Sequence, residues 1–314
     1  MVLHFFLPNE YVYNKKRWCS MKDLTCVPED CLPNQFPAQH QDIQPGIESR
    51  MIPEPIFDDP CYVGSGKLKN KVAFITGGDS GIGRAVSVIY AKEGADIAIS
   101  YLYEEGDARK TKEIVESYGA KCKLYPGDIR SEKFCRQLVC NVVSDFGALD
   151  ILVNNAGVQF PQPSINDIVR NQLLLTFEIN VFPLFYLTQE ALRYMKQGSC
   201  IINTASVTAY EGNVQLIDYS ASKGAVVSFT RALSQTLTER KIRVNAVAPG
   251  PIWTPLIVSS FSAEYVTTFG QETPMKRAGQ PFELAPTYVY LASRDSTYVT
   301  GQVIHVNGGT LTDS

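Results

Sequence analysis

Tyr219 and Lys223 could together carry out proton transfer, because they lie four positions apart at the start of an expected helix. Positions i and i+4 share one helix face. A phenol with its ordinary pKa of about 10 is a poor base at neutral pH, and a neighbouring ammonium group favours the phenolate. Ser206 ends an apolar run thirteen residues upstream and could add a hydroxyl to the same site. The alternatives are an exposed helix face and a capping serine.

A glycine-rich turn could bind the phosphates of a dinucleotide. The segment from Thr76 to Ala85 reads Thr-Gly-Gly-Asp-Ser-Gly-Ile-Gly-Arg-Ala and lies between an expected strand and an expected helix. The N-terminus of a helix exposes unpaired N–H groups and a positive dipole end, and glycines let the backbone approach a ligand closely. The position after the first strand favours a dinucleotide site. A plain tight turn is the alternative.

These residues require a sheet that presents them at one edge. From Lys71 onward, short apolar runs alternate with helical patterns, which predicts an α/β chain with a doubly wound Rossmann fold and helices on both faces of a seven-stranded parallel sheet. The expected strands are Val72–Thr76, Asp96–Tyr101, Cys122–Tyr125, Ile151–Asn154, Cys200–Thr204, Arg243–Val247 and Val303–Val306. The expected helices cover residues 82–93, 105–118, 131–146, 167–196, 218–240 and 281–293.

One expected helix contains a proline. Pro183 cannot donate a hydrogen bond to the carbonyl of Ile179, so the helix over 167–196 should be kinked beside Asn180. The alternative is that the helix tolerates the strain without a functional consequence.

The motifs together resemble the short-chain dehydrogenase/reductase family, in its subgroup of about 250 residues. The glycines follow a Gly-x-x-x-Gly-x-Gly spacing after a threonine, and Asn154-Asn155-Ala156-Gly157, the Tyr-x-x-x-Lys pattern and a Pro-Gly segment at Pro249 follow in the family's order. The resemblance covers about residues 67–310. It implies that Ser206 orients the substrate oxygen, Tyr219 is the general acid/base, Lys223 lowers the pKa of Tyr219 and holds the nicotinamide ribose, and Asn180 orders a water.

The resemblance also implies a nicotinamide dinucleotide and no metal. The matching cofactor positions are Gly77, Asp79, Ser80, Gly81, Ile82, Gly83, Tyr101, Asp128, Ile129, Asn155, Ala156, Gly157, Tyr219, Lys223, Pro249, Gly250, Ile252 and Thr254. The acid that usually marks NAD at the end of the second strand is replaced by Tyr101. Residues 99–105 contain no arginine for a 2′-phosphate, and Asp79 and Glu104 would repel one. We expect NAD, with NADP as the alternative.

The implied reaction is reversible hydride transfer between this cofactor and an alcohol or carbonyl compound. The expected substrate segments are Val158–Pro163, Tyr210–Asn213 and Trp253–Thr268. Their Phe160, Tyr210 and Trp253 either suit a partly apolar substrate or pack a lid over the nicotinamide. A non-catalytic dinucleotide sensor is the alternative function. A sugar-nucleotide epimerase or dehydratase fits less well, because only 60 residues follow Thr254.

Prolines mark an arm in front of this domain. Eight of the 18 prolines lie in the first 60 residues, which predicts an irregular arm over 1–66 and a catalytic domain over 67–314. Residues 39–66 resemble the leader of bacterial general-stress-protein-like oxidoreductases, and we expect them to be ordered against the body or a neighbouring subunit. The basic site is not expected to need the arm. Residues 1–20 do not resemble that leader, and Met21 is an alternative translation start.

Composition excludes several other classes. With 29 basic and 32 acidic residues the net charge is −3, without the basic footprint of a nucleic-acid-binding protein. Leu3–Leu7 is too short for a signal-peptide core, and no run of about 20 apolar residues could span a membrane. The eight cysteines form no Cys-x-x-Cys pair, and we expect reduced thiols in a cytoplasmic protein. The family resemblance implies a homotetramer that binds a small-molecule substrate.

Overall fold

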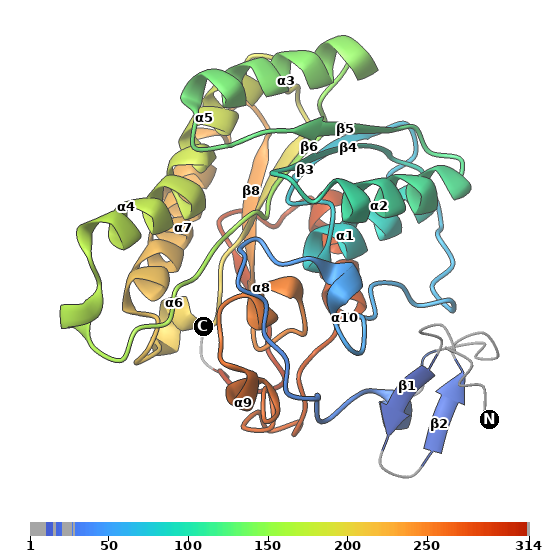
Figure 1. Cartoon of the computed structure of the whole chain (residues 1–314). Coiled ribbons are helices and arrows are strands. Elements are labelled where there is room, and N and C mark those ends of the chain that lie inside the picture. Colours follow the sequence, from blue (N-terminus) through green and yellow to red (C-terminus); the bar gives the residue numbers. More distant parts are fainter. Residues whose placement is uncertain (1–10, 15–16, 21–26, 28, 313–314) are drawn as a thin grey trace.

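Seven parallel strands form the centre of the computed structural model, which describes residues 11–14, 17–20, 27 and 29–312. Their order in the sheet is β5-β4-β3-β6-β7-β8-β9 (Figure 1). The strand order reverses between the neighbouring strands β3 and β6. Doubly wound folds bind ligands at such a switch point, outside the carboxyl ends of the strands. The bounds are β3 Val72–Thr76, β4 Asp96–Tyr101, β5 Cys122–Pro126, β6 Ile151–Asn154, β7 Cys200–Thr204, β8 Arg243–Pro249 and β9 Val303–Val306. The predicted fold class is confirmed.

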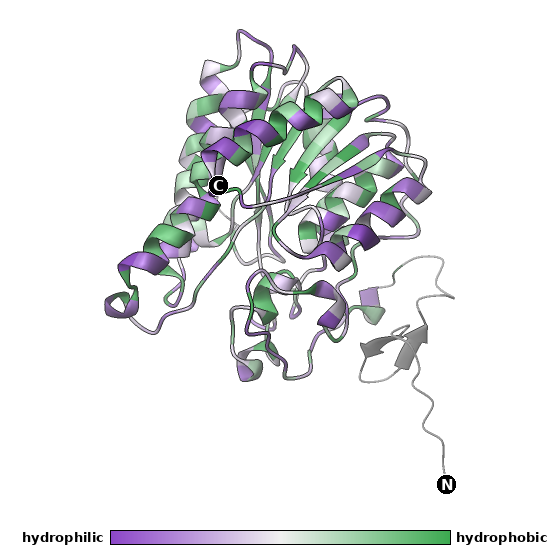
Figure 2. Ribbon diagram, turned by 45° about the horizontal axis from the view of Figure 1, so that its top comes forward, coloured by the Kyte–Doolittle hydropathy of each residue, from purple (hydrophilic) through white to green (hydrophobic). Residues whose placement is uncertain are grey.

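Helices cover both faces of this sheet. Alternate residues of β3 face opposite layers: Ala73 and Ile75 belong to the core with α1 and α10, whereas Val72 and Phe74 pack with α3 and α5. Figure 2 shows the strands mainly hydrophobic and the helices with hydrophilic outer faces. The helices are α1 Gly81–Lys92, α2 Glu105–Ser117, α3 Glu132–Phe146, α4 Arg170–Asn180, α5 Phe182–Ala191, α6 Thr208–Glu211, α7 Ile217–Thr236, α8 Pro255–Val258, α9 Ala263–Val266 and α10 Pro281–Ala292. Among the described residues, none of these helices is long and apolar enough to cross a membrane.

The expected helix over 167–196 is divided into α4 and α5. Val181 separates them with φ −123° and ψ −52°, and Pro183 lies in the first turn of α5. Proline is favourable there because the N–H groups of a first turn have no partner within the helix. The break at Asn180 that Pro183 predicts is therefore confirmed, although it ends one helix and starts another.

The arm is more structured than the proline count suggests. Two short strands, β1 (Tyr11–Asn14) and β2 (Arg17–Ser20), pair antiparallel, and short 3-10 turns occur at Glu29–Cys31 and Glu48–Arg50. The expectation of an irregular arm is wrong for these segments. The arm also packs on the body, since Phe282 N donates to Ile56 O at 3.1 Å. The ordering of residues 39–66 is thereby confirmed, while the domain division at residue 66 stays a prediction.

The cysteines fall into two groups. Cys122, Cys135, Cys140 and Cys200 are free thiols, as expected. Cys61 is disulfide-bonded, so the expectation of a reduced thiol is wrong for this arm residue.

Candidate active site

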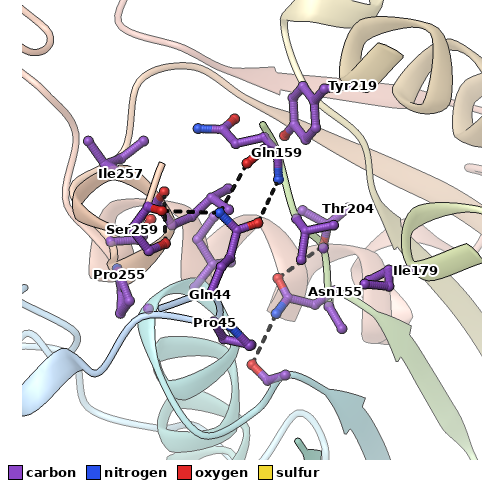
Figure 3. Close-up of a pocket in the computed structure, with 18 of the residues that line it drawn as sticks. Gln44, Pro45, Asn155, Gln159, Ile179, Thr204, Tyr219, Pro255, Ile257 and Ser259 are labelled. Atoms are coloured by element: carbon purple, nitrogen blue, oxygen red, sulfur yellow. Dashed lines mark hydrogen bonds between the residues drawn. The ribbon is translucent and has the colours of Figure 1, made fainter. Parts of the chain in front are cut away.

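A cavity of about 510 Å³ opens at the carboxyl edge of the sheet (Figure 3). Segments that follow six of the seven parallel strands contribute to its wall, as expected for a ligand site of a doubly wound fold. The predicted residues in this wall are Gly77, Asp79, Ser80, Gly81, Ile82, Tyr101, Asp128, Ile129, Asn155, Ala156, Gly157, Ser206, Tyr219, Lys223, Pro249, Gly250, Ile252 and Thr254. The structure therefore brings together nearly all of the predicted site.

One end of the cavity holds Ser206, Tyr219 and Lys223, all of them buried. Ser206 follows β7, and its Oγ accepts hydrogen bonds from the Thr208 N–H at 3.2 Å and from the Thr208 hydroxyl at 3.0 Å. Tyr219 and Lys223 project from the first two turns of α7, with Lys223 Nζ 5.6 Å from the centre of the Tyr219 ring. Lys223 Nζ also donates to the Thr204 carbonyl at 2.8 Å. This end can exchange a proton and orient an oxygen atom.

Burial determines the ionisation of this end. It raises the pKa of Tyr219 to about 12, against the opposing effect of a hydrogen bond with Ser206. Burial also lowers the pKa of Lys223 to about 8. Burial therefore sets the net direction for Tyr219 in the protein alone, and the lowering of its pKa by Lys223 stays a prediction.

Asn180 lies behind the wall rather than in it. Its Oδ1 accepts from Val158 N at 2.8 Å, and its Nδ2 donates to Val158 O at 2.9 Å and to Ser222 Oγ at 3.0 Å. A Cβ at Gly157 would lie 3.3 Å from Asn180 Oδ1 and 3.5 Å from Lys223 Nζ. Asn180 thus fixes the loop after β6 at the point where Gly157 lies beside Lys223.

The glycine-rich turn is shaped by backbone contacts. Gly77 and Gly81 have φ of +61° and +51°, a region that disfavours side chains. Gly83 lies outside the cavity wall, where a Cβ would come within 1.8 Å of Gly77 O. Asn155 Nδ2 donates to Gly77 O at 3.1 Å and holds the turn against β6. Gly83 therefore serves close packing rather than direct contact with a ligand.

The opposite end of the cavity is acidic. Asp79 and Glu104 are 4% and 3% exposed. Burial, followed by the charge of Glu104, raises the pKa of Asp79 to about 7. Glu104 accepts hydrogen bonds from Leu102 N at 3.1 Å and Tyr103 N at 2.8 Å, while Asp128 pairs with Arg130 at 2.5 Å. An anionic group bound here would meet acidic neighbours.

The predicted aromatic substrate residues have different roles. Phe160 lines the cavity. Trp253 is fully buried, stacks on Phe36 with ring centres 3.7 Å apart, and donates its indole N–H to Pro53 O at 2.9 Å. Tyr210 packs edge-to-face on His305 at 4.6 Å, in a second hollow. Trp253 and Tyr210 are therefore packing residues.

Sequence reasoning missed the contribution of the arm. Gln44, Pro45 and Gly46 line the cavity, and none of them was among the predicted site residues. Their resemblance to a leader segment indicated that they would be ordered, but it gave no indication of where they dock. The arm thus forms part of the cavity wall, while the expectation that the basic site does not need the arm stays a prediction.

The cavity fits a nicotinamide dinucleotide. Its wall includes the acidic residues, the first turn of α1 and Tyr219, and its volume lies in the range of pockets that enclose cofactors. Any side chain at Gly157 would fill the space beside Lys223, and one at Gly81 would lie 3.1 Å from Thr254. The glycines thus keep the cradle open where a diphosphate and a ribose would lie.

The chain is similar to known proteins over most of its length. A family model described as Enoyl-(Acyl carrier protein) reductase matches residues 77–311. General stress protein 39 of Bacillus subtilis is 58% identical over 277 residues, covering 88% of this chain and 97% of its own. The chain belongs to the short-chain dehydrogenase/reductase family. Another relative, NADPH-dependent aldehyde reductase 1 of Arabidopsis thaliana, is 50% identical over 283 residues, covering 88% and 98% of the two chains.

A solved member of the short-chain dehydrogenase/reductase family has the same fold. The crystal structure of a glucose/ribitol dehydrogenase from Brucella melitensis is 34% identical in sequence, with a TM-score of 0.71. The match covers 79% of this chain and 99% of that chain. The protein is therefore an NAD(P)-dependent oxidoreductase of this family, close to the bacterial general stress proteins.

Proposed function

We propose that this protein catalyses reversible hydride transfer between NAD and an alcohol or carbonyl substrate, with Tyr219 as general acid/base. The observation that carries the proposal is the convergence of Ser206, Tyr219 and Lys223 on one end of a cavity that fits a dinucleotide. A nicotinamide bound there supplies the hydride acceptor or donor. The remaining chemistry belongs to the protein.

Each side chain has a role that its contacts support. The Ser206 hydroxyl orients the substrate oxygen, and the Tyr219 phenol exchanges a proton with it. With a pKa near 12 the phenol is protonated at neutral pH, which is the form that carbonyl reduction requires. Lys223 holds the nicotinamide ribose beside the phenol. Asn180, tied to Val158 and Ser222, orders the water that connects Lys223 with solvent.

The acidic end supports NAD as the preferred cofactor. The carboxylates of Asp79 and Glu104 already repel each other, and they would also repel a 2′-phosphate. A 2′-hydroxyl can instead donate a hydrogen bond to them. NADP remains the alternative, because one relative is named NADPH-dependent. Comparison of kcat/KM with NAD and NADP on one substrate tests this preference.

Two relatives suggest substrate classes for the test. One is named an aldehyde reductase and the other a glucose/ribitol dehydrogenase, and the catalytic end has both apolar and polar lining residues. We therefore propose aldehydes and polyols or sugars as the first panel, run in both directions with both cofactors. Turnover followed by nicotinamide absorbance supports the function. Tight cofactor binding without turnover across the panel would favour a dinucleotide sensor instead.

The outer face of α4 and α5 supports an oligomer. Leu173, Phe182 and Phe185 are 43%, 38% and 45% exposed there, and a second copy could cover them. We propose a homotetramer, as is common in the family, and size-exclusion chromatography with light scattering tests it. A location in the cytoplasm is likewise part of the proposal, and fractionation of the source cells tests it.

A further inference from the structure

The arm crosses the cofactor cavity, and we propose that residues 44–48, called the strap below, keep a bound dinucleotide in place, with Gln44 as a positioning residue. The inference rests on the proposed function, because it needs a dinucleotide in the cavity. It assigns a binding role to a segment that lies outside the motifs of the family. Three separate anchors of the strap support it.

The first anchor is at the start of α1. Glu48 is fully buried, its Oε2 accepts from the Gly81 N–H at 2.5 Å, and its Oε1 forms an ion pair with the fully buried Arg84. The Glu48 N–H in turn donates to Asp107 Oδ2 at 2.7 Å. A buried pair of this kind holds its geometry because a lone buried charge is costly. The end of the strap is therefore fixed to the turn that would hold the phosphates.

The second anchor is beyond the end of β4. The Tyr103 hydroxyl donates to Pro45 O at 2.6 Å, and Tyr103 itself is 46% exposed. The next residue, Gly46, approaches α8 so closely that a Cβ would lie 2.7 Å from Pro255 O. The middle of the strap therefore spans the cavity between the β4 end and α8.

The third anchor is Gln44 itself. Its Nε2 donates to Gln159 O at 3.0 Å and to Ser259 O at 3.4 Å, and its Oε1 accepts from Gln159 N at 3.1 Å (Figure 3). Gln159 lies in the loop after β6, and Ser259 follows the last residue of α8. One side chain thus joins two walls of the cavity near Tyr219, and both walls lose that connection if the amide is removed.

These contacts predict where the strap acts. Gln44 uses its amide on protein backbone, so its effect on a ligand passes through the positions of the Gln159 loop and of α8. Loosening these two walls should increase the rate of cofactor dissociation more than the rate of association, since mutational effects on affinity appear mainly in dissociation. The chemical step at Tyr219 should change much less.

Two matched pairs of variants test the strap. Gln44→Met keeps the volume but removes the amide. Gln39→Met is its control, because within the described part of the chain Gln39 bonds to Pro37 and Ile52 of the arm itself. Tyr103→Phe removes the second anchor. Its control is Tyr118→Phe, because the equally exposed Tyr118 bonds the arm at Asp58, away from the cavity. NADH and NADPH titrations by fluorescence give Kd, stopped flow gives the dissociation rate, and thermal unfolding without cofactor gives Tm.

We expect Gln44→Met to raise the cofactor Kd about tenfold, since it removes three hydrogen bonds, and Tyr103→Phe to raise it about threefold. Both controls should stay within twofold of the wild type. A Gln44→Met protein with wild-type Kd overturns the inference while leaving the proposed function intact. Equal rises of the cofactor Kd in the target and control variants also overturn it, because they indicate that any substitution near the arm loosens the fold. If Gln44→Met does not fold, Tyr103→Phe against Tyr118→Phe decides alone. A wild type that binds neither cofactor overturns the function and the inference together.

Discussion

The two ends of the cofactor cavity are built differently. At the catalytic end, Tyr219 and Lys223 are four residues apart on one helix, so a local pattern fixes their relation. Beside the acidic end, Glu48 from the arm meets Arg84 of α1 and Asp107 of α2, and Arg84 Nε donates to Asp79 O at 3.0 Å. Chemistry at one end is thus encoded locally, whereas the other end exists only once distant segments have packed together.

Their electrostatics differ as well. Burial suppresses charge at both ends, because it raises the pKa of Tyr219, lowers that of Lys223 and raises that of Asp79. The difference is that beside the acidic end the buried guanidinium of Arg84 lies among carboxylates. Substitution of Tyr219 should therefore change rate with little effect on stability, and substitution of Glu48 beside Arg84 should do the reverse.

The largest effect is expected for Tyr219→Phe. Loss of the proton-transferring hydroxyl should lower kcat about 10²–10⁴-fold, while cofactor Kd stays near that of the wild type. Steady-state kinetics and cofactor titration measure the two quantities. Tyr298→Phe, at a fully exposed tyrosine, is the control. Near-normal turnover of Tyr219→Phe would remove the catalytic assignment.

Glu48→Gln tests the other side of the comparison. Removing one partner of a buried ion pair should lower the free energy of unfolding by about 3 kcal/mol. Glu54→Gln is the control within the same arm, because the Glu54–Lys110 pair is part-exposed and should contribute less than about 1 kcal/mol. Urea unfolding measures both. An equal loss of unfolding free energy in Glu48→Gln and Glu54→Gln would contradict a special role for the buried Glu48–Arg84 pair.

Lys223→Met should change how stability depends on pH. The folded pKa of about 8 lies below the ordinary 10.5, so between these values the unfolded chain binds more protons and stability rises with pH. From pH 7 to 9 the wild type should gain about 1.4 kcal/mol relative to Lys223→Met. Urea unfolding at the two pH values checks this, with the exposed Lys69→Met as a control that follows the wild type. Parallel pH profiles for wild type and Lys223→Met would show that burial does not discharge the lysine.

The smallest effect is expected at Asp79. Asp79→Asn removes one negative charge near the site of a 2′-phosphate, which should improve kcat/KM for NADP relative to NAD about fivefold, or about 1 kcal/mol. Asp295→Asn, at a residue paired with Lys67 outside the cavity wall, should leave the ratio unchanged. If Asp79→Asn lowers kcat/KM for NADP relative to NAD, Asp79 does not oppose binding of the 2′-phosphate.

The success of sequence-based prediction follows the same division. The strand β3 and the break beside Pro183 were predictable because a short apolar run and a missing N–H act within a few residues. The packing of Trp253 on Phe36 and the docking of Gln44 were not, because their partners are more than one hundred residues away. The pKa of Tyr219 also depends on burial, which a Tyr-x-x-x-Lys spacing does not specify.

The strap also affects the order in which the molecule is completed. Gln44 leaves the ribosome among the first residues of the site, yet Gln159 and Ser259 follow 115 and 215 residues later. Closing such long loops carries an entropic cost that only an almost finished body can offset. The earliest part of the site to be synthesised should therefore be among the last to dock, and a nascent chain would have its catalytic motifs before it could retain a cofactor.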